Sequence, residues 1–260
     1  MRRKSAQHGC SAIGVALGTA DLHIHTRISD GMASIEQVLE FVEHRTELDV
    51  IAVTDHEDAS GGQRARELAA ARGYRFEVIV GADVTTLGGH LLALYIETTP
   101  RSFRRVESTL EAIHAQDGLA VVPHPMSWLT RSLSRRTIDR ICARDEPGIT
   151  FDGIETGNPS PAGRITATRA TTLNHRTWHL AETGGSDAHH LLHLGTGWTE
   201  FDGAGAEGLR LALSAGATTA GMTRYPSIRD VGIGRTAAGL VWGYAATPRK
   251  MLRIGTRKGE

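Results

Sequence analysis

Short apolar segments typical of buried strands recur along this chain, and segments of helical period lie between them. Residues 50–54, Val-Ile-Ala-Val-Thr, form one such strand segment. Six others are expected, at residues 18–25, 76–80, 90–96, 119–122 and 149–155 and in the run that ends at Gly184. Strands that alternate with helices usually run parallel and are joined by right-handed crossovers. The pattern therefore predicts an α/β fold, either a seven-stranded (β/α) barrel or an open doubly wound sheet.

The intervening segments predict the helices. The first helix opens at Ser34, which has the spacing of a capping box to Gln37. The longest helix is expected to begin at Pro100 and to end at Gly118, with Phe103 facing the core. Further helices are expected near residues 61–72, 131–143, 162–174 and 207–213.

The chain of 260 residues is long enough for one large α/β domain. We expect a barrel over residues 18–223, preceded by a leader at residues 1–17 and followed by a basic helix and tail at residues 224–260. The apolar run of the leader is interrupted by glycines, and cleavage after Ala20 would remove the start of the first strand, so a secretory signal is rejected. No segment is apolar enough to span a membrane, and a cytoplasmic location is expected.

Composition limits the kinds of partner. The 29 basic and 29 acidic residues give a formal net charge of zero, which demands neither nucleic acid nor an anionic membrane. Nucleic acid is therefore expected only as a short substrate, and the oligomeric state is left open. Thirteen histidines stand against two cysteines, Cys10 and Cys142, so a metal site would be built from nitrogen and oxygen ligands.

The segment Asp21-Leu-His-Ile-His-Thr lies at the end of the first expected strand. Side chains alternate between the two faces of a strand, so Asp21, His23 and His25 share one face. Two imidazoles at this spacing can hold one metal ion. An isolated His-x-His is more often a pair of ordinary histidines, and a metal site is favoured here because later segments supply matching residues.

Histidine and aspartate recur where the other expected strands end. These residues are His56, Asp83, His124, Asp187 and His189. In a barrel, this edge is the rim on which active sites are built, whereas an open sheet gathers ligands at one switch point. Because the residues come from nearly every strand, the barrel is favoured.

Taken together, these segments resemble the PHP family, named for polymerase and histidinol phosphatase. The resemblance covers roughly residues 18–200 and rests on Asp21-Leu-His-Ile-His-Thr, Thr54-Asp55-His56, Gly81-Ala82-Asp83, Gly89-His90, Pro123-His124-Pro125 and Gly185-Ser186-Asp187-Ala188-His189. It implies a distorted seven-stranded (β/α) barrel that holds two or three divalent metal ions (Mn, Zn or Fe) and hydrolyses phosphate esters.

Carried over residue by residue, the resemblance implies nine metal ligands in three sets. These are His23, His25 and Asp187 for the first ion, Asp83 (as a bridge), His90 and His124 for the second, and Asp30, His56 and His189 for the third. Asp83, His124 and His189 are also the expected catalytic residues. The bridging residue of the family is more often glutamate, so Asp83 is one methylene shorter. Asp21 and Asp55 are expected behind the ligands, where they would fix histidine tautomers.

The expected reaction is attack of a metal-bound hydroxide on a phosphate mono- or diester of a small molecule or a nucleotide. Arg131 and Arg164 are the candidates for binding substrate phosphate, because arginine forks suit it, and Asn158 is a further candidate contact. An amidohydrolase-like C–N hydrolase is a second interpretation, and the absence of an obvious bridging lysine counts against it. A metal-stabilised barrel that only binds a partner is a third, and the complete ligand set counts against that.

Overall fold

The computed structural model describes residues 17–144, 146–234, 237 and 241–242, and nine strands lie in this part of the chain. They are β1 (Leu17–Ile24), β2 (Val50–Val53), β3 (Glu77–Thr85), β4 (His90–Leu94), β5 (Leu119–Val122), β6 (Gly153–Gly157), β7 (Ala181–Gly184), β8 (Gly197–Asp202) and β9 (Thr218–Met222). All nine form one sheet in the order β7-β6-β5-β4-β3-β2-β1-β8-β9. At its two edges, the Thr218 hydroxyl donates a 2.7 Å hydrogen bond to the Glu182 carbonyl. The sheet is therefore nearly closed. The predicted α/β barrel is confirmed, with nine strands instead of the expected seven.

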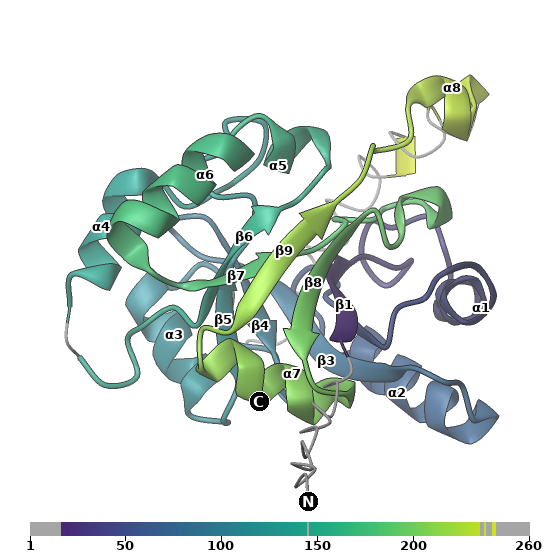
Figure 1. Ribbon diagram of the computed structural model, residues 1–260, viewed down its shortest axis with the longest axis horizontal. Coiled ribbons are helices and arrows are strands. Elements are labelled where there is room, and N and C mark those ends of the chain that lie inside the picture. The colour runs from purple at the N-terminus through teal and green to yellow at the C-terminus, as the bar shows by residue number, and fades with distance from the viewer. Residues whose placement is uncertain (1–16, 145, 235–236, 238–240, 243–260) are drawn as a thin grey trace, which may run out of the picture.

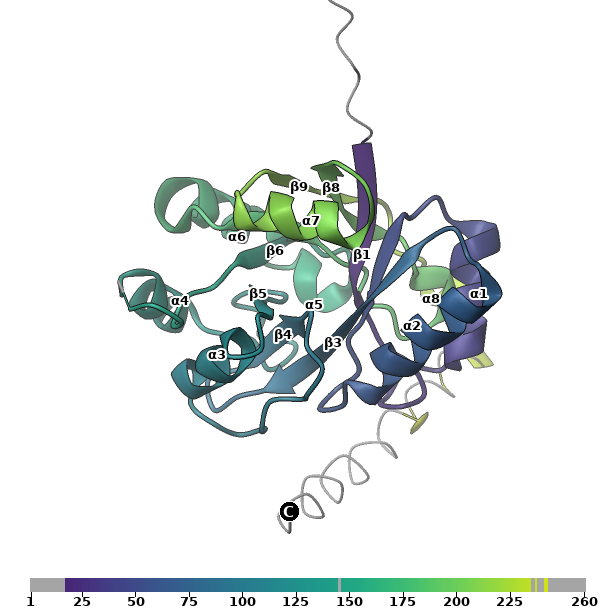
Figure 2. The same cartoon turned by 90° about the horizontal axis from the view of Figure 1, so that it is seen from below.

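Helices and short helical turns connect and follow these strands. They are α1 (Ile35–Arg45), α2 (Ser60–Arg72), α3 (Val106–His114), α4 (Arg135–Cys142), α5 (Pro161–Arg164), α6 (Ala167–Leu173), the π turn η1 (Asn174–Trp178), the 3₁₀ turn η2 (Leu191–His193), α7 (Gly205–Ser214) and α8 (Ile228–Val231). Helices α1 and α2 lie on one side of the barrel, and α3, α4 and α6 lie on the other (Figures 1 and 2). The predicted capping box is confirmed, since Ser34 and Gln37 each accept a hydrogen bond from the backbone N–H of the other.

The directions of the strands differ from the prediction. Pairs β1–β2, β2–β3, β5–β6 and β6–β7 are parallel as expected, but β4 is antiparallel to both neighbours, and β8 is antiparallel to β1 and β9. Only residues 86–89 join β3 to β4. This length makes a hairpin, because a parallel crossover needs a dozen residues or more. As a result, the start of β4 lies beside the end of β3.

The longest predicted helix begins later than expected. Helix α3 starts at Val106 rather than at Pro100, because the preceding segment follows the β3–β4 hairpin instead. Within that segment, the Phe103 N–H donates a 2.7 Å hydrogen bond to the Thr85 carbonyl. Phe103 has a φ of 54° and is 40% exposed, so the prediction that it faces the core is wrong.

Apolar side chains form one layer inside the barrel and two layers outside it. Successive residues of β2 point to opposite sides of the sheet. Ile51 and Val53 pack outside it, toward α1 and α2, and Val50 packs in the interior of the barrel. A second outer cluster lies under α3 and α4. Phe201 and Leu209, from β8 and α7, belong to the interior cluster. Helix α7 therefore closes one end of the barrel, and the other end, where β1–β3 finish, is left to polar side chains.

No helix in the described ranges is long and apolar enough to cross a membrane. The division of the chain into leader, barrel and basic tail stays a prediction. Residues 1–16 and 243–260 lie outside the described residues. So do residues 235–236 and 238–240, which follow α8.

The His114 imidazole ties the end of α3 to the loop before β6. Its Nε2 lies 2.9 Å from Asp152 Oδ2, and its Nδ1 lies 2.9 Å from the Gly148 carbonyl oxygen. The hydrogen bond with Asp152 raises the pKa of His114. The resulting stabilisation is fully present below the unfolded-state pKa, about 6.5, and is lost as the pH rises through the higher folded-state pKa.

We expect His114→Gln to lower the free energy of unfolding by about 1 kcal/mol near pH 5.5 and by less near pH 8.5. Urea unfolding at the two pH values measures the difference. His44→Gln is the control, because the exposed His44 imidazole pairs at 3.3 Å with the exposed Glu40, and a surface pair of this kind contributes little, so both losses should be close to zero. An equal loss for His114→Gln at both pH values would contradict the assignment.

Candidate metal centre

The end of β1 carries His23 and His25 into the polar end of the barrel. Both imidazoles are buried, and their Nε2 atoms lie 3.6 and 3.5 Å from Asp187 Oδ1. The His25 N–H donates a 3.0 Å hydrogen bond to the Ala188 carbonyl, which fastens the loop after β7 to the end of β1. Two segments that lie far apart in the sequence thereby place the Asp187 carboxylate between the imidazoles of His23 and His25.

Asp83 occupies the middle of the cluster. Its Oδ2 lies 3.2 Å from His56 Nδ1, 3.2 Å from His90 Nδ1 and 3.8 Å from His23 Nε2. Three local features produce this arrangement. Strand β3 continues past the end of β2, a bridge pairs Asp83 with His56, and the tight turn before β4 returns His90 to the same edge.

His124 joins from the loop after β5. His23, His124 and Asp187 offer ligand atoms that lie within 4.8 Å of one another. His124 and Asp187 have positive φ angles of 30° and 52°. Such angles are unfavourable for residues other than glycine, and strained backbone of this kind is concentrated at functional sites.

A further group lies nearer the surface and contains His25, Asp30, His56 and His189. Asp30 joins its members, since Oδ1 lies 3.4 Å from His189 Nε2 and Oδ2 lies 3.6 Å from His56 Nε2. The His189 side chain is 39% exposed, which makes it the most open of these side chains. This group therefore faces the mouth of the site.

The arrangement fits divalent cations. The four groups bring together all nine of the residues that the sequence suggested as ligands. Their nitrogen-to-oxygen distances of 3.2–3.8 Å approach the ~3.0–3.4 Å expected for two atoms that each lie ~2.1 Å from one ion. Within the described residues, six buried atoms of His23, His25, Asp83 and His90 have no hydrogen-bond partner. Since buried polar atoms are nearly always satisfied, these orphaned nitrogen and oxygen atoms suit metal binding.

The electrostatics favour positive charge in the same place. Burial alone would raise the pKa of Asp83, but the imidazoles of His90 and His56 hold it well below its usual range. Burial also opposes charge on His23, yet Glu155 and Asp187 raise its pKa to about 10. A divalent cation would supply the favoured charge while the imidazoles stay neutral.

Glu155, in the middle of β6, is a functional residue that the sequence analysis missed. It is buried, and its carboxylate lies 2.8 Å from His23 Nδ1. It also accepts hydrogen bonds from the His124 backbone N–H at 2.6 Å and from the Asn158 side-chain amide at 2.8 Å. A carboxylate on Nδ1 selects the tautomer that leaves Nε2 free to bind a metal. The signal was present in the sequence, because Glu155 is a carboxylate at the end of the strand expected over residues 149–155.

Asp21 and Asp55 have a different role from the one expected. Asp21 accepts hydrogen bonds from the backbone N–H groups of Ser186 and Gly195, and Asp55 accepts from the N–H and the hydroxyl of Thr26. Both carboxylates therefore hold the loops that carry ligands. The prediction that they fix histidine tautomers is wrong, because their hydrogen-bond partners are backbone N–H groups and hydroxyls and not imidazoles.

The three expected substrate contacts lie in different settings. Asn158 is buried, and its amide is used by Glu155 and by the Ser160 N–H, so the structure gives it a supporting role instead of a substrate contact. Arg131 is exposed and lies 5.7 Å above the Phe103 ring. Arg164 is exposed at the end of α5. A substrate role for the two arginines stays a prediction.

The comparisons with known proteins agree with this geometry. Residues 21–147 match the PHP domain, and residues 174–218 match the PHP-associated family. An uncharacterised protein of Methanocaldococcus jannaschii is 31% identical over 151 residues, which cover 54% of this chain and 81% of that protein. The phosphoribosyl 1,2-cyclic phosphate 1,2-diphosphodiesterase of Eggerthella lenta is 35% identical over 102 residues, or 36% of this chain and 38% of that enzyme.

A similar fold occurs in a two-domain protein of Bacteroides vulgatus that contains a predicted PHP-like metal-dependent phosphoesterase. The TM-score is 0.65 at 19% identity, and the match covers 80% of this chain and 65% of the other. At this identity, the likeness concerns the fold alone. The sequence matches and the shared fold together show that the chain belongs to the PHP family.

Proposed function

We propose that this protein is a metal-dependent hydrolase of phosphate mono- or diesters, acting on a small molecule or a nucleotide. The observation that carries the proposal is the position of Asp83. It belongs to two ligand groups, one with His23 and His25 and the other with His56 and His90. A carboxylate shared in this way suits the bridge of a two-metal centre, in which the ions act on both the attacking and the leaving oxygen.

The nine clustered residues would hold two or three divalent ions, and nitrogen and oxygen ligands of these types suit Mn, Zn or Fe. When bound, such ions polarise phosphoryl oxygens and lower the pKa of water. Asp83 remains ionised between the groups and offsets the positive charge there. Glu155 would hold the His23 imidazole in position, and Asp21 would hold the loop that carries Asp187.

Three residues are proposed to act on the substrate directly or through the ions. Asp83 and His124 define the buried side of the centre, where the phosphoryl group would be held. His189 is the most exposed of the nine and lies at the mouth. In a centre of two ions that leaves His189 unligated, its imidazole is placed to hold or donate a proton at the leaving oxygen.

Two observations support a phosphate ester over an amide. The name of the Eggerthella lenta relative describes a phosphodiesterase, and that enzyme shares 102 aligned residues with this chain. In addition, no lysine occurs between residues 5 and 249, so none of the strands can supply a bridging lysine of amidohydrolase type. The cytoplasmic location expected from the sequence stays a prediction.

The first test is hydrolysis itself. We expect the protein loaded with Mn to bind more than one equivalent of metal and to release alcohol from phosphate mono- or diesters. His25→Ala should reduce the rate by about two orders of magnitude or more, because removing even an outer partner of a ligand typically costs 10–100-fold. His44→Ala, on the exposed face of α1, should retain the wild-type rate. Absence of hydrolysis from a broad set of both ester types would refute the proposed activity.

The second test concerns the bridge. Asp83→Asn keeps the size of the side chain but removes its charge, so we expect it to lose one equivalent of metal and nearly all activity. Asp83→Glu keeps the charge and should retain metal and some turnover, although the extra methylene costs about 1–3 kcal/mol if it overpacks this buried position. Metal analysis and rates in saturating Mn measure both variants. Full activity in Asp83→Asn would mean that Asp83 is not the bridge.

The third test concerns Glu155. Glu155→Gln keeps the shape but weakens the hold on His23 Nδ1, and we expect metal affinity to fall about 10–100-fold with the fold retained. Competition with a metal chelator measures the affinity, and near-wild-type activity should return in excess metal. The matched control is Glu97→Gln, an exposed glutamate that pairs with Arg66 away from the site. Identical metal affinities for Glu155→Gln and the control would show that Glu155 does not support metal binding.

A further inference from the structure

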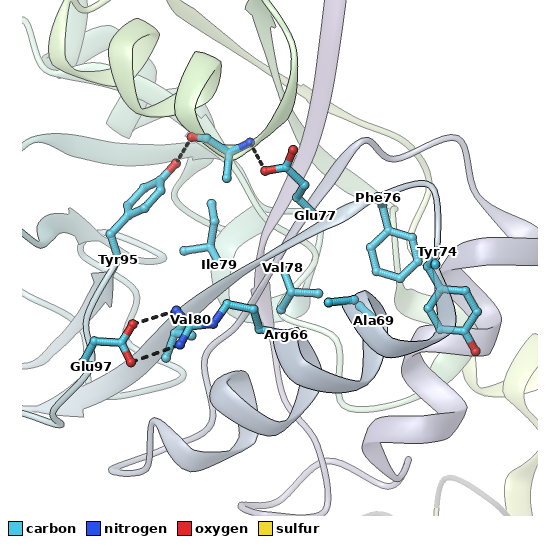
Figure 3. A pocket seen from close by; sticks show the side chains of 13 residues that line it. Arg66, Ala69, Tyr74, Phe76, Glu77, Val78, Ile79, Val80, Tyr95 and Glu97 are labelled. Carbon is cyan, nitrogen blue, oxygen red and sulfur yellow. Dashed lines mark hydrogen bonds and ion pairs between the residues drawn. The ribbon is translucent and has the colours of Figure 1, made fainter.

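A cavity of about 530 Å³ opens beside the first half of β3 (Figure 3). It is lined by residues 77–80 of β3, by side chains of α2, by Tyr95 and by Ala206 of α7. Along β3, Glu77 and Asp83 are six residues apart, which corresponds to about 20 Å. The cavity is therefore separate from the proposed active site.

One edge of β3 is open along this cavity. Strand β2 pairs with residues 77–80 on one side, whereas β4, on the other side, pairs only with residues 81–85. Strand β4 ends at Leu94, and the next residue, Tyr95, has a φ of 57°, which interrupts the extended backbone. In the described part of the chain, no strand therefore covers the second edge of residues 77–79, which we call the open edge.

The open edge presents the backbone of Val78. The Glu77 N–H donates a 2.9 Å hydrogen bond to the Asp49 carbonyl on the β2 side, and the Val80 carbonyl accepts one of 3.2 Å from the Ile96 N–H on the other side. Because these groups alternate along a strand, the N–H and C=O of Val78 also point away from β2. Among the described residues, neither group has a hydrogen-bond partner, although Val78 is buried. Since buried backbone groups are nearly always paired, this edge suits a ligand that offers its own N–H and C=O.

The side chains on the two sides of β3 differ in character. Val78 lies against Ala69 of α2, whereas Ile79 and Glu77 lie on the opposite side, toward Tyr95 and α7 (Figure 3). A strand added along the open edge would direct its own side chains alternately to these two sides. One set would meet small apolar groups, and the other set would meet the carboxylate of Glu77.

The charges of the lining favour a basic ligand. Arg66 and Glu97 neutralise each other in a two-pronged ion pair, so Glu77 is the remaining charged side chain of the lining. Its Oε2 accepts a 2.9 Å hydrogen bond from the Ala206 N–H. Within the described residues, Glu77 forms no ion pair, and its Oε1 has no hydrogen-bond partner. A lysine or arginine is complementary to this carboxylate.

We propose that the open edge of β3 is a docking site for an extended peptide segment of a partner protein, one in which basic and apolar side chains alternate. The peptide exchanges backbone hydrogen bonds with Val78, packs its apolar side chains against Ala69 and pairs a basic side chain with Glu77. In strand addition of this kind, the backbone bonds supply affinity and the alternate side chains supply specificity. The proposal goes beyond the phosphoesterase function and does not depend on it, because the site lies at the opposite end of β3.

The first arm of the test concerns charge. Two fluorescein-labelled peptides, Lys-Val-Lys-Val-Lys-Val and Glu-Val-Glu-Val-Glu-Val, are titrated with the full chain, and binding is followed by fluorescence anisotropy. We expect the lysine peptide to bind about tenfold more tightly than the glutamate peptide. Glu77→Lys should reverse this preference. Glu146→Lys, which changes an exposed glutamate that pairs with Arg144 elsewhere on the surface, should keep it.

The second arm concerns the backbone. Val78→Pro removes the N–H of the open edge and spares the hydrogen bonds to β2, and proline is tolerated on such an edge. We expect this variant to bind the lysine peptide about tenfold more weakly. If Val78→Pro does not fold, the reversal in Glu77→Lys decides alone.

Equal binding of the two peptides to the wild type, or unchanged binding in a folded Val78→Pro, would overturn the proposal. Absence of binding would overturn it as well. In that case, slow hydrogen exchange of the Val78 amide in the protein alone would identify the occupant as another part of this chain or a second copy.

Discussion

Compensation of buried negative charge is the condition on which the rest of this structure depends. Asp21, Asp55, Asp83 and Glu155 are all buried at one end of the barrel, where an ionised carboxylate is tolerated only with donors or cations around it. Asp21 and Asp55 receive backbone N–H groups and hydroxyls, and Glu155 receives an N–H group, an amide and an imidazole. The Asp83 carboxylate has no hydrogen-bond partner among the described residues and lies beside the imidazoles of His56 and His90, so it is the carboxylate left for metal ions.

The sequence predicted the features that depend on local chemistry. The alternation of faces along a strand placed His23 and His25 together, and strand-end positions placed Asp83, His124 and Asp187 at the same rim. Buried strands of four apolar residues, such as β2, and a helix with a capping box, α1, were also predictable because their signals lie within a few neighbouring residues. The α/β barrel followed from these elements.

Features that depend on distant partners were missed. Strand β8 reads Gly-Trp-Thr-Glu-Phe-Asp, and its alternating pattern gains meaning only when it pairs antiparallel with β1 and β9. Phe103 has helical surroundings in sequence, but its backbone bonds to Thr85 across the hairpin. Glu155 looks like one polar residue in a strand, and its role becomes visible only when His23 and His124, from other strands, lie against it.

The reversal of β4 has a consequence for the order of folding. Asp83 and His90 lie on the two arms of one short hairpin, so their approach closes a small loop and has a small entropic cost. The meeting of β1 with the Asp187 loop, marked by the hydrogen bond from the Ser186 N–H to Asp21, joins positions 165 residues apart. Contacts of such long range are slow to form. Part of the centre can therefore assemble early and locally, while the complete set of ligands exists only after the whole barrel has closed.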